Sequence, residues 1–272
     1  MKELRVTAIQ ATSVAGNWEE KWAGVDVPHA LELLDEASTM GSDIVCFPEL
    51  YPLVGEQELL EKAKELNIYI VAGLAEGGTQ KWHNTSTIIS PFGGIVGRQT
   101  KNYPTALELD NGVVAGNEFN VYETDIGRLG IVICADFAFF NDGVQSLKDD
   151  NVDILFNPAV WFALSEAFPH TVIGRHMEYS VPMLGVNLGR PSESRSDALF
   201  PPAGGFSTIC VPPQVANMDE LWSWFRDKSG GIDSTDGFIY TLGPKEEIKT
   251  VRIDIDAVRK FPGYFSTRSP TR

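Results

Sequence analysis

Short, almost wholly apolar segments recur along this chain, with room for a helix between most of them. Their length and their content of Val and Ile indicate β-strands, and their lack of polar alternation indicates strands covered on both faces. The sheets that they form must therefore lie beneath helices. The clearest of these segments are 4–10 (LRVTAIQ), 43–47 (DIVCF), 68–74 (IYIVAGL), 129–134 (LGIVIC) and 153–157 (DILFN).

Helical patterns separate several of these strands. Residues 26–40 place apolar side chains at helical spacing before Gly41, and residues 56–66 form a charged amphipathic pattern. Strands alternating with helices predict an α/β fold. A hairpin at 84–101 around Gly93-Gly94 makes the sheets mixed rather than purely parallel. Further helices are expected at 140–148 and 169–180, and further strands at 119–123, 183–187, 206–211, 238–242 and 249–255, with 206–211 and 238–242 as a pair.

The domain organisation follows from the continuity of this pattern. No linker or low-complexity tract interrupts the 272 residues, so we expect one domain over 1–272. Residues 214–236 separate two late strands and read as an insertion. Within it, 218–228 (MDELWSWFRDK) is expected to form a short helix with its aromatic side chains on one face.

Charge and cysteine content exclude several classes of protein. Lys and Arg number 22 against 37 Asp and Glu, a net charge of −15, which argues against nucleic acid or an anionic membrane as partner. No segment approaches the roughly 18 apolar residues of a membrane span, and no N-terminal stretch has the basic region, apolar core and small-residue cleavage site of a signal peptide. The odd count and long spacing of Cys46, Cys134 and Cys210 suggest neither a disulfide framework nor a zinc site. A cytoplasmic, reducing location is expected.

Three reactive side chains follow three of the predicted strands. Glu49 comes after 43–47, Lys101 ends the hairpin, and Cys134 ends 129–134 before a helix. Chemistry in α/β folds gathers at such strand ends. A helix N-terminus favours a thiolate and an oxyanion, a carboxylate can accept the thiol proton, and an ammonium group can stabilise negative charge. Position alone also fits a buried cysteine and two solvated charges, so both interpretations stay open at this point.

The sequence around these residues resembles the nitrilase superfamily of carbon–nitrogen hydrolases, which carries a Glu–Lys–Cys triad. The match runs in order from about Leu4 to Phe261. The segments that carry it are Phe47-Pro48-Glu49-Leu50, the hairpin from Asn84-Thr85-Ser86-Thr87-Ile88-Ile89 to Lys101, residues 125–134 (DIGRLGIVIC), Arg175-His176-Met177-Glu178 and Asn187-Leu188-Gly189.

This resemblance implies a four-layer α-β-β-α sandwich and a mechanism without metal or cofactor. Glu49 would be the general base and Cys134 the nucleophile that forms a thioester. Lys101 and the backbone N–H of Ala135 would hold the oxyanion. Glu108, seven positions after Lys101, would orient the substrate, although a plain loop carboxylate fits that position equally well. The resemblance also implies a homo-oligomer.

The substrate expected from the resemblance is a small amide that yields ammonia and a carboxylic acid. Cys134-Ala135-Asp136 resembles the Cys-x-Asp of amide and carbamoyl hydrolases, so an N-carbamoyl (ureido) hydrolase and a nitrilase are the alternatives. Asp136 itself is expected to cap the following helix. Phe139 and Phe140 fit either an apolar substrate site or core packing. The segment after Glu49 is short, which predicts an open pocket or one closed by another part of the chain.

Two alternatives lie outside this class. A non-catalytic binding or scaffold protein would keep the fold and show no selective reactivity at Cys134. A cysteine protease fits less well because neither His170 nor His176 lies in a recognisable Cys–His context.

Overall fold

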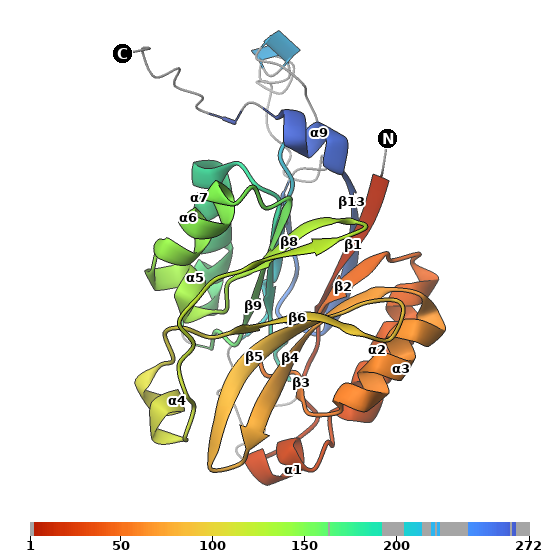
Figure 1. Cartoon of the computed structure of the whole chain (residues 1–272), viewed down its shortest axis with the longest axis vertical. Helices are drawn as coiled ribbons and strands as arrows, with labels where there is room; N and C mark the ends of the chain where they lie inside the picture. The colour runs from red at the N-terminus through yellow and green to blue at the C-terminus, as the bar shows by residue number, and fades with distance from the viewer. Residues whose placement is uncertain are drawn as a thin grey trace.

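The computed structural model describes residues 3–162, 164–191, 204–213, 219–220, 222–223, 239–261 and 263–264. Two β-sheets pack face to face, and helices cover the outer face of each (Figure 1). The predicted α-β-β-α sandwich with mixed sheets is thereby confirmed.

The first sheet has the strand order β13-β1-β2-β4-β5-β6, with β3 beside β4. Its centre, β1-β2-β4, is parallel, and the hairpin strands and β13 add to it antiparallel. Helices α2 (Val27–Thr39) and α3 (Glu56–Leu66) cover its outer face. The strands are β1 (Glu3–Gln10), β2 (Ile44–Cys46), β3 (Pro52–Leu53), β4 (Tyr69–Gly78), β5 (Lys81–Ile89), β6 (Ile95–Thr100) and β13 (Glu247–Asp254).

The second sheet has the order β12-β11-β10-β9-β8-β7, again with a parallel centre, β8-β9-β10. Helices α5 (Ala135–Phe139), α6 (Asp142–Asp149) and α7 (Phe168–Tyr179) lie on its outer side (Figure 1). Its strands are β7 (Val121–Thr124), β8 (Gly127–Ile131), β9 (Ile154–Ala159), β10 (Met183–Asn187), β11 (Thr208–Cys210) and β12 (Ile239–Thr241). Short helices outside the layers are α1 (Trp18–Trp22), α4 (Ala106–Asp110), a 3-10 turn at Ser165–Ala167 and α9 (Ile255–Lys260).

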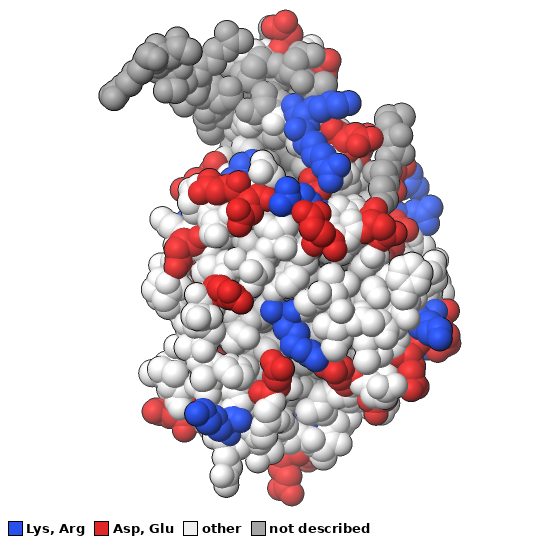
Figure 2. All heavy atoms as spheres, viewed as in Figure 1, with Lys and Arg blue, Asp and Glu red and all other residues white. Residues whose placement is uncertain are grey.

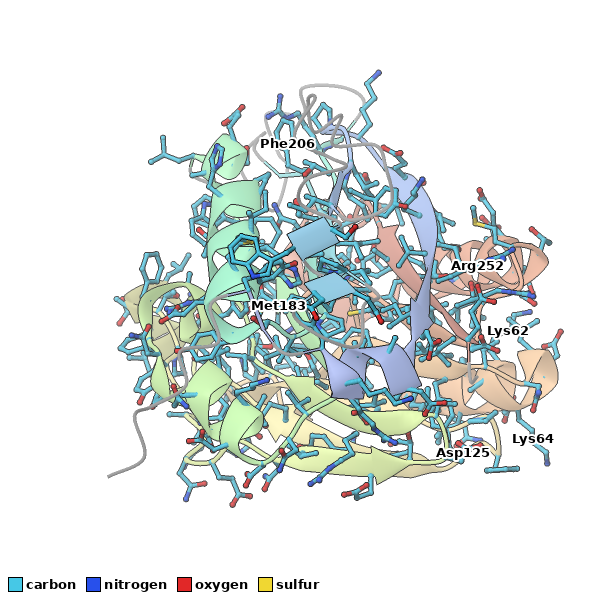
Figure 3. All side chains as sticks on the ribbon, turned by 90° about the horizontal axis from the view of Figure 1, so that it is seen from above. Lys62, Lys64, Asp125, Met183, Phe206 and Arg252 are labelled. Atoms are coloured by element: carbon cyan, nitrogen blue, oxygen red, sulfur yellow. The ribbon has the colours of Figure 1, made fainter. Side chains whose placement is uncertain are left out.

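Three hydrophobic cores separate the four layers. On β1, Ala8 points into the core between the sheets and Ile9 into the core beneath α2 and α3, because successive strand residues face opposite sides. Met183 of β10 lies in the third core, under α7, and Figure 3 shows it deep inside the molecule. Lys62 and Lys64 lie on the outer side of α3 in the same view. The wholly apolar strands are thus explained by burial on both faces.

Three predicted strands end earlier than expected on the side of a reactive residue: β8 ends at Ile131, β6 at Thr100 and β2 at Cys46. Cys134 and Lys101 therefore lie beyond their strands rather than at the last strand position. The chain still runs beside β9, where Val132 and Cys134 donate backbone hydrogen bonds to Phe156 and Pro158. Pro48 has no N–H to extend β2. The short helices α1, α4 and α5 were not predicted.

The later part of the chain is described only in part. The predicted pairing of 206–211 with 238–242 is confirmed, since β11 pairs antiparallel with β12. Most of the proposed insertion at 214–236 lies outside the described residues, so it and the one-domain organisation stay predictions. Among the described residues, no helix has the length and apolar character that a membrane crossing requires. Acidic and basic side chains are interspersed over the face in Figure 2.

Candidate active site

Glu49, Lys101 and Cys134 line one pocket of about 230 Å³, together with Glu108. Each of the three triad residues follows a strand: Glu49 follows β2, Lys101 follows β6 and Cys134 follows β8. β2 and β6 belong to the first sheet and β8 to the second, so the site combines residues that follow strands of both sheets. The structure brings together the four side chains to which the sequence assigned a catalytic or substrate-orienting role.

The Glu49 carboxylate is buried and held at both oxygens. Its Oε1 accepts hydrogen bonds from Lys101 Nζ (2.7 Å) and Asn84 Nδ2 (2.8 Å), and its Oε2 accepts one from the backbone N–H of Val160 (2.9 Å). Three donors from separate parts of the chain leave this side chain a single orientation. Its basic oxygens are thus fixed in the pocket.

The backbone around Glu49 is positioned by close packing against β4. A Cβ atom at Gly73 would lie 2.4 Å from the backbone nitrogen of Leu50 and 2.6 Å from the carbonyl oxygen of Pro48. Only glycine allows this approach. Leu50 adopts a positive φ of 56°, and its carbonyl accepts a hydrogen bond of 2.8 Å from buried Lys21, whose ammonium group also pairs with Asp26 at 2.7 Å.

Lys101 is surrounded by negative groups. Its Nζ donates to Glu49 and to both oxygens of Glu108 at 2.8 and 2.9 Å. Burial lowers the pKa of Lys101, but Glu49, Cys134 and Glu108 oppose it more strongly, so the pKa lies above its ordinary value. Burial raises the pKa of Glu108, but Lys101 and the hydrogen bonds to this carboxylate lower it by more, so the pKa lies below its ordinary value. Both groups are therefore charged at neutral pH.

Glu108 has two sets of partners. It forms a capping box with Thr105 at the start of α4, and it accepts a hydrogen bond of 2.8 Å from Asn84. The amide of Asn84 therefore bridges Glu49 and Glu108. Glu108 lines the pocket and contacts Lys101, so it is part of the cluster and not a plain loop carboxylate.

Cys134 occupies a strained turn between the end of β8 and α5. Its φ of 48° and ψ of −104° lie outside the usual regions for a residue with a side chain. Burial raises the pKa of the thiol, Glu49 raises it further, and Lys101 opposes the shift without overcoming it. Burial and the Glu49 carboxylate outweigh any stabilisation of the thiolate by the N-terminus of α5, which has only five residues. The resting group is therefore a thiol beside the Glu49 carboxylate.

The two residues after Cys134 have distinct backbone surroundings. The N–H of Ala135 has no hydrogen-bond partner within the described part of the chain. The expectation that Asp136 caps its own helix is wrong. Its carboxylate instead accepts hydrogen bonds from the backbone N–H groups of Asn102 and Tyr103, both at 2.8 Å. It ties the segment after Lys101 to the segment after Cys134. Burial raises the pKa of Asp136 to about 6, and the two backbone hydrogen bonds oppose that rise.

Neither expectation for Phe139 and Phe140 is correct. Both side chains are exposed, and neither lines the pocket. Phe140 stacks on Tyr103 with ring centroids 3.8 Å apart, and Phe139 stacks on Trp161. On α5 the aromatic side chain that enters the core is Phe137, and residues two positions apart on a helix point to nearly opposite sides, so Phe139 faces outward.

The short segment after Glu49 is compensated by other elements. The wall of the pocket comes from Trp18 of α1, Trp82 of β5, Leu107 of α4 and Val113. Several residues that shape the site have no role that the sequence predicts: Asn84, Val160, Gly73 and Lys21. Two of them carry a signal, since Asn84 begins the hairpin motif of the family resemblance and Gly73 is an isolated glycine within an apolar strand.

The family profile and the related sequences that match this chain belong to the same group of proteins. The carbon-nitrogen hydrolase family profile matches residues 5–191. A nitrilase of Pyrococcus abyssi is 26% identical over 150 residues, covering 48% of this chain and 56% of that protein. A deaminated glutathione amidase of Synechocystis sp. is 29% identical over 193 residues, covering 60% of this chain and 68% of that protein. The match thus spans little more than half of the nitrilase and about two thirds of the amidase.

A solved structure agrees over a longer range. Saccharomyces cerevisiae Nit3, a member of branch 10 of the nitrilase superfamily, superposes with a TM-score of 0.76 and 16% identity, covering 99% of this chain and 97% of that chain. At this identity the likeness establishes the fold. Family profile, relatives and fold lead to one conclusion: the chain belongs to the carbon-nitrogen hydrolase family of the nitrilase superfamily.

Proposed function

We propose that this protein hydrolyses a small amide through a thioester on Cys134, releasing ammonia and a carboxylic acid. The observation that carries the proposal is the meeting of Glu49, Lys101 and Cys134 in one pocket. Because the pKa of the Cys134 thiol is raised, the reaction needs a base at the moment of attack, and Glu49 is the carboxylate whose charge acts on this thiol most strongly.

Acylation follows from this arrangement. The Cys134 proton passes to Glu49 as Sγ bonds to the amide carbon, and the carbonyl oxygen gains negative charge. The charged Lys101 and the unpartnered N–H of Ala135 are the donors available to that oxygen. The C–N bond then breaks, and the nitrogen takes the proton from Glu49 and leaves as ammonia.

Deacylation reuses the same base. A water molecule gives a proton to Glu49 as its oxygen attacks the thioester carbon. The C–S bond breaks, the acid leaves, and the proton returns to Cys134. Glu108, held against Lys101, keeps that ammonium group directed into the pocket and offers the substrate's N–H groups an acceptor.

The choice of an amide rests on two supports. Cys134-Ala135-Asp136 resembles the amide and carbamoyl hydrolases, and one of the relatives is named an amidase. The other relative is named a nitrilase, which keeps a nitrile as the second candidate. A nitrile consumes two water molecules and gives the same products, whereas a ureido substrate also gives carbon dioxide.

Ammonia release from matched substrates tests the proposal. Pentanamide, pentanenitrile and an N-carbamoyl amino acid are incubated with the wild type, with Cys134→Ala and with Cys210→Ala as control, because Cys210 lies in the core outside the pocket. We expect ammonia from the amide, retained in Cys210→Ala and reduced at least about 10³-fold in Cys134→Ala. Release that persists in Cys134→Ala rejects the thioester mechanism.

Alkylation separates the enzyme from the scaffold alternative. Cys134 is half-buried and lines the pocket, whereas Cys46 and Cys210 are buried in the cores. Iodoacetamide, itself a small amide, should modify Cys134 first, with loss of ammonia release in proportion. No substrate turned over and equal, slow labelling of all three cysteines would favour a binding protein.

A further inference from the structure

The polar groups that line the pocket are already engaged with one another. Glu49, Lys101 and Glu108 form one hydrogen-bonded cluster. Thr105 donates to Glu108, and the side-chain amide of Asn111 donates to the carbonyl of Leu107 within α4. Among the described residues that line the pocket, Lys101 is the sole cation, and it is bound to two carboxylates. None of them offers a free cation to a second charged group of the substrate.

The charge of this cluster disfavours an anion. Two carboxyl groups face one ammonium group, so the three side chains carry one formal negative charge. Glu49 and Lys101 are each only 2% exposed, so solvent screens that charge weakly. A carboxylate on the substrate would meet repulsion and lose its hydration without a partner.

The remaining walls are apolar and rigid. Trp82 is 3% exposed, lies edge-on to Trp22 with ring centroids 5.5 Å apart, and stands 6.2 Å from Trp18. Its indole N–H donates to the carbonyl of Asn111 at 3.1 Å, so only its ring is left for a ligand. Leu50 and Val113 pack in the same cluster.

The strand places this cluster beside the catalytic groups. Trp82 and Asn84 are two positions apart on β5 and therefore point to the same side of the sheet. Asn84 hydrogen-bonds Glu49, so the indole lies on the side of the strand that faces the base. A substrate whose amide carbon meets Cys134 extends its acyl chain along Trp82, Trp18 and Leu50.

We infer that the substrate carries an uncharged, apolar acyl group, which seats against the wall formed by Trp18, Leu50, Trp82 and Val113, and that ω-amides of dicarboxylic acids are rejected. The inference rests on the proposed function. A cavity of about 230 Å³ lies below the usual size of ligand pockets, so the acyl chain is short.

A matched pair of amides tests the inference. Pentanamide and glutaramate, the monoamide anion of pentanedioic acid, differ at the end of the chain by a methyl group against a carboxylate. We expect kcat/KM for pentanamide to exceed that for glutaramate by at least about 100-fold, since a buried unpaired charge costs several-fold more than a lost methyl contact. From acetamide to pentanamide, kcat/KM should rise about fourfold per methylene. Equal or better turnover of glutaramate overturns the inference.

An added cation should reverse part of this preference. Leu107 lies on the exposed side of α4 and lines the pocket, whereas Leu109 on the same helix is similarly exposed and does not. Leu107→Arg should raise glutaramate turnover relative to pentanamide at least about tenfold by supplying a partner for the carboxylate. Leu109→Arg is the matched control and should leave the ratio as in the wild type. An unchanged ratio in Leu107→Arg, or the same rise in both variants, contradicts the placement of the acyl chain.

The two proposals fail in different ways. If no amide releases ammonia in a Cys134-dependent manner, the proposed function fails. If glutaramate is the preferred substrate and its turnover depends on Cys134, the amidase stands and the inference alone is wrong. Should only nitriles react, pentanenitrile against 4-cyanobutyrate repeats the same comparison of charge.

Discussion

Glu49 Oε1 accepts a hydrogen bond of 2.7 Å from Lys101 Nζ, although 52 positions of the chain separate the two residues. Both side chains are almost fully buried. A buried ion pair of this kind is costly unless further hydrogen bonds satisfy it. Asn84, Val160 and Glu108 supply those bonds here, so the pair is held as one unit with a fixed orientation toward Cys134.

Replacing Lys101 by methionine should impair both activity and stability. Glu49 and Glu108 would then face each other without an intervening cation, and the oxyanion would lose a donor. We expect kcat to fall by about 10²- to 10³-fold and the free energy of unfolding to fall by about 3–5 kcal/mol. Lys62→Met is the control, because Lys62 pairs with the exposed Asp35 on a neighbouring helix and should cost at most about 1 kcal/mol. Urea denaturation and ammonia release measure the two effects; equal losses in both variants would contradict the role of Lys101.

Asp136→Asn should change how stability depends on pH. The pKa of Asp136 is raised to about 6 in the folded protein from an ordinary value of 3.8, so the folded state binds the proton more tightly. Its contribution to stability is present below pH 4 and is lost as the pH rises toward 6, by about 3 kcal/mol in total. Between pH 4 and 7, the melting temperature of the wild type minus that of the variant should decrease as the pH rises, because only the wild type loses this contribution. Parallel curves would mean that Asp136 titrates normally.

His176→Gln should reveal a slope of the opposite sign. His176 is buried on α7, where its Nδ1–H donates to the Val181 carbonyl and its Nε2 accepts from the Tyr264 hydroxyl. Burial lowers the pKa of His176 to about 4. The unfolded chain takes up a proton near pH 6.5 and the folded chain does not, so stability falls as the pH decreases from about 6.5 to 4. The variant should lose this fall, and His170→Gln, an exposed histidine of the same helix, should keep it. Melting temperatures of the wild type and of both histidine variants from pH 4 to 7 test this prediction.

Lys21→Met should weaken the protein at a distance from the triad. Lys21 pairs with Asp26 at 2.7 Å, and both side chains are fully buried. Its loss leaves Asp26 without its cation and should cost about 3–5 kcal/mol. It also frees the carbonyl of Leu50, the residue after Glu49, so kcat should fall more than KM changes. Lys64→Met on the exposed side of α3 is the control. A stable variant with unchanged kcat would show that this pair does not hold Glu49 in place.

Much of the fold could be predicted because its signals are local. A run such as LGIVIC reports burial on both faces, and the pattern of 56–66 matches α3 at both ends. The short helices α1, α4 and α5 are not recognisable from the sequence, because five residues cover little more than one helical turn and apolar residues cannot recur at helical spacing. The ends of β2 and β8 differ from the prediction because apolar residues, and single backbone hydrogen bonds to the neighbouring strand, continue past the last residue in strand conformation.

The sequence by itself determined the class of fold, the family and the candidate residues Glu49, Lys101 and Cys134, since motifs and apolar periodicity are properties of neighbouring positions. For Glu108 it left two interpretations open. Only the tertiary structure decided that Asn84 joins two carboxylates, that Asp136 binds another segment instead of its own helix, and that Trp82 and Trp18 form a wall of the pocket. It also decided that the Cys134 thiol has a raised pKa. The physical reason is that hydrogen-bond partners, burial and local charge depend on which distant segments meet, and no neighbouring residue carries that information.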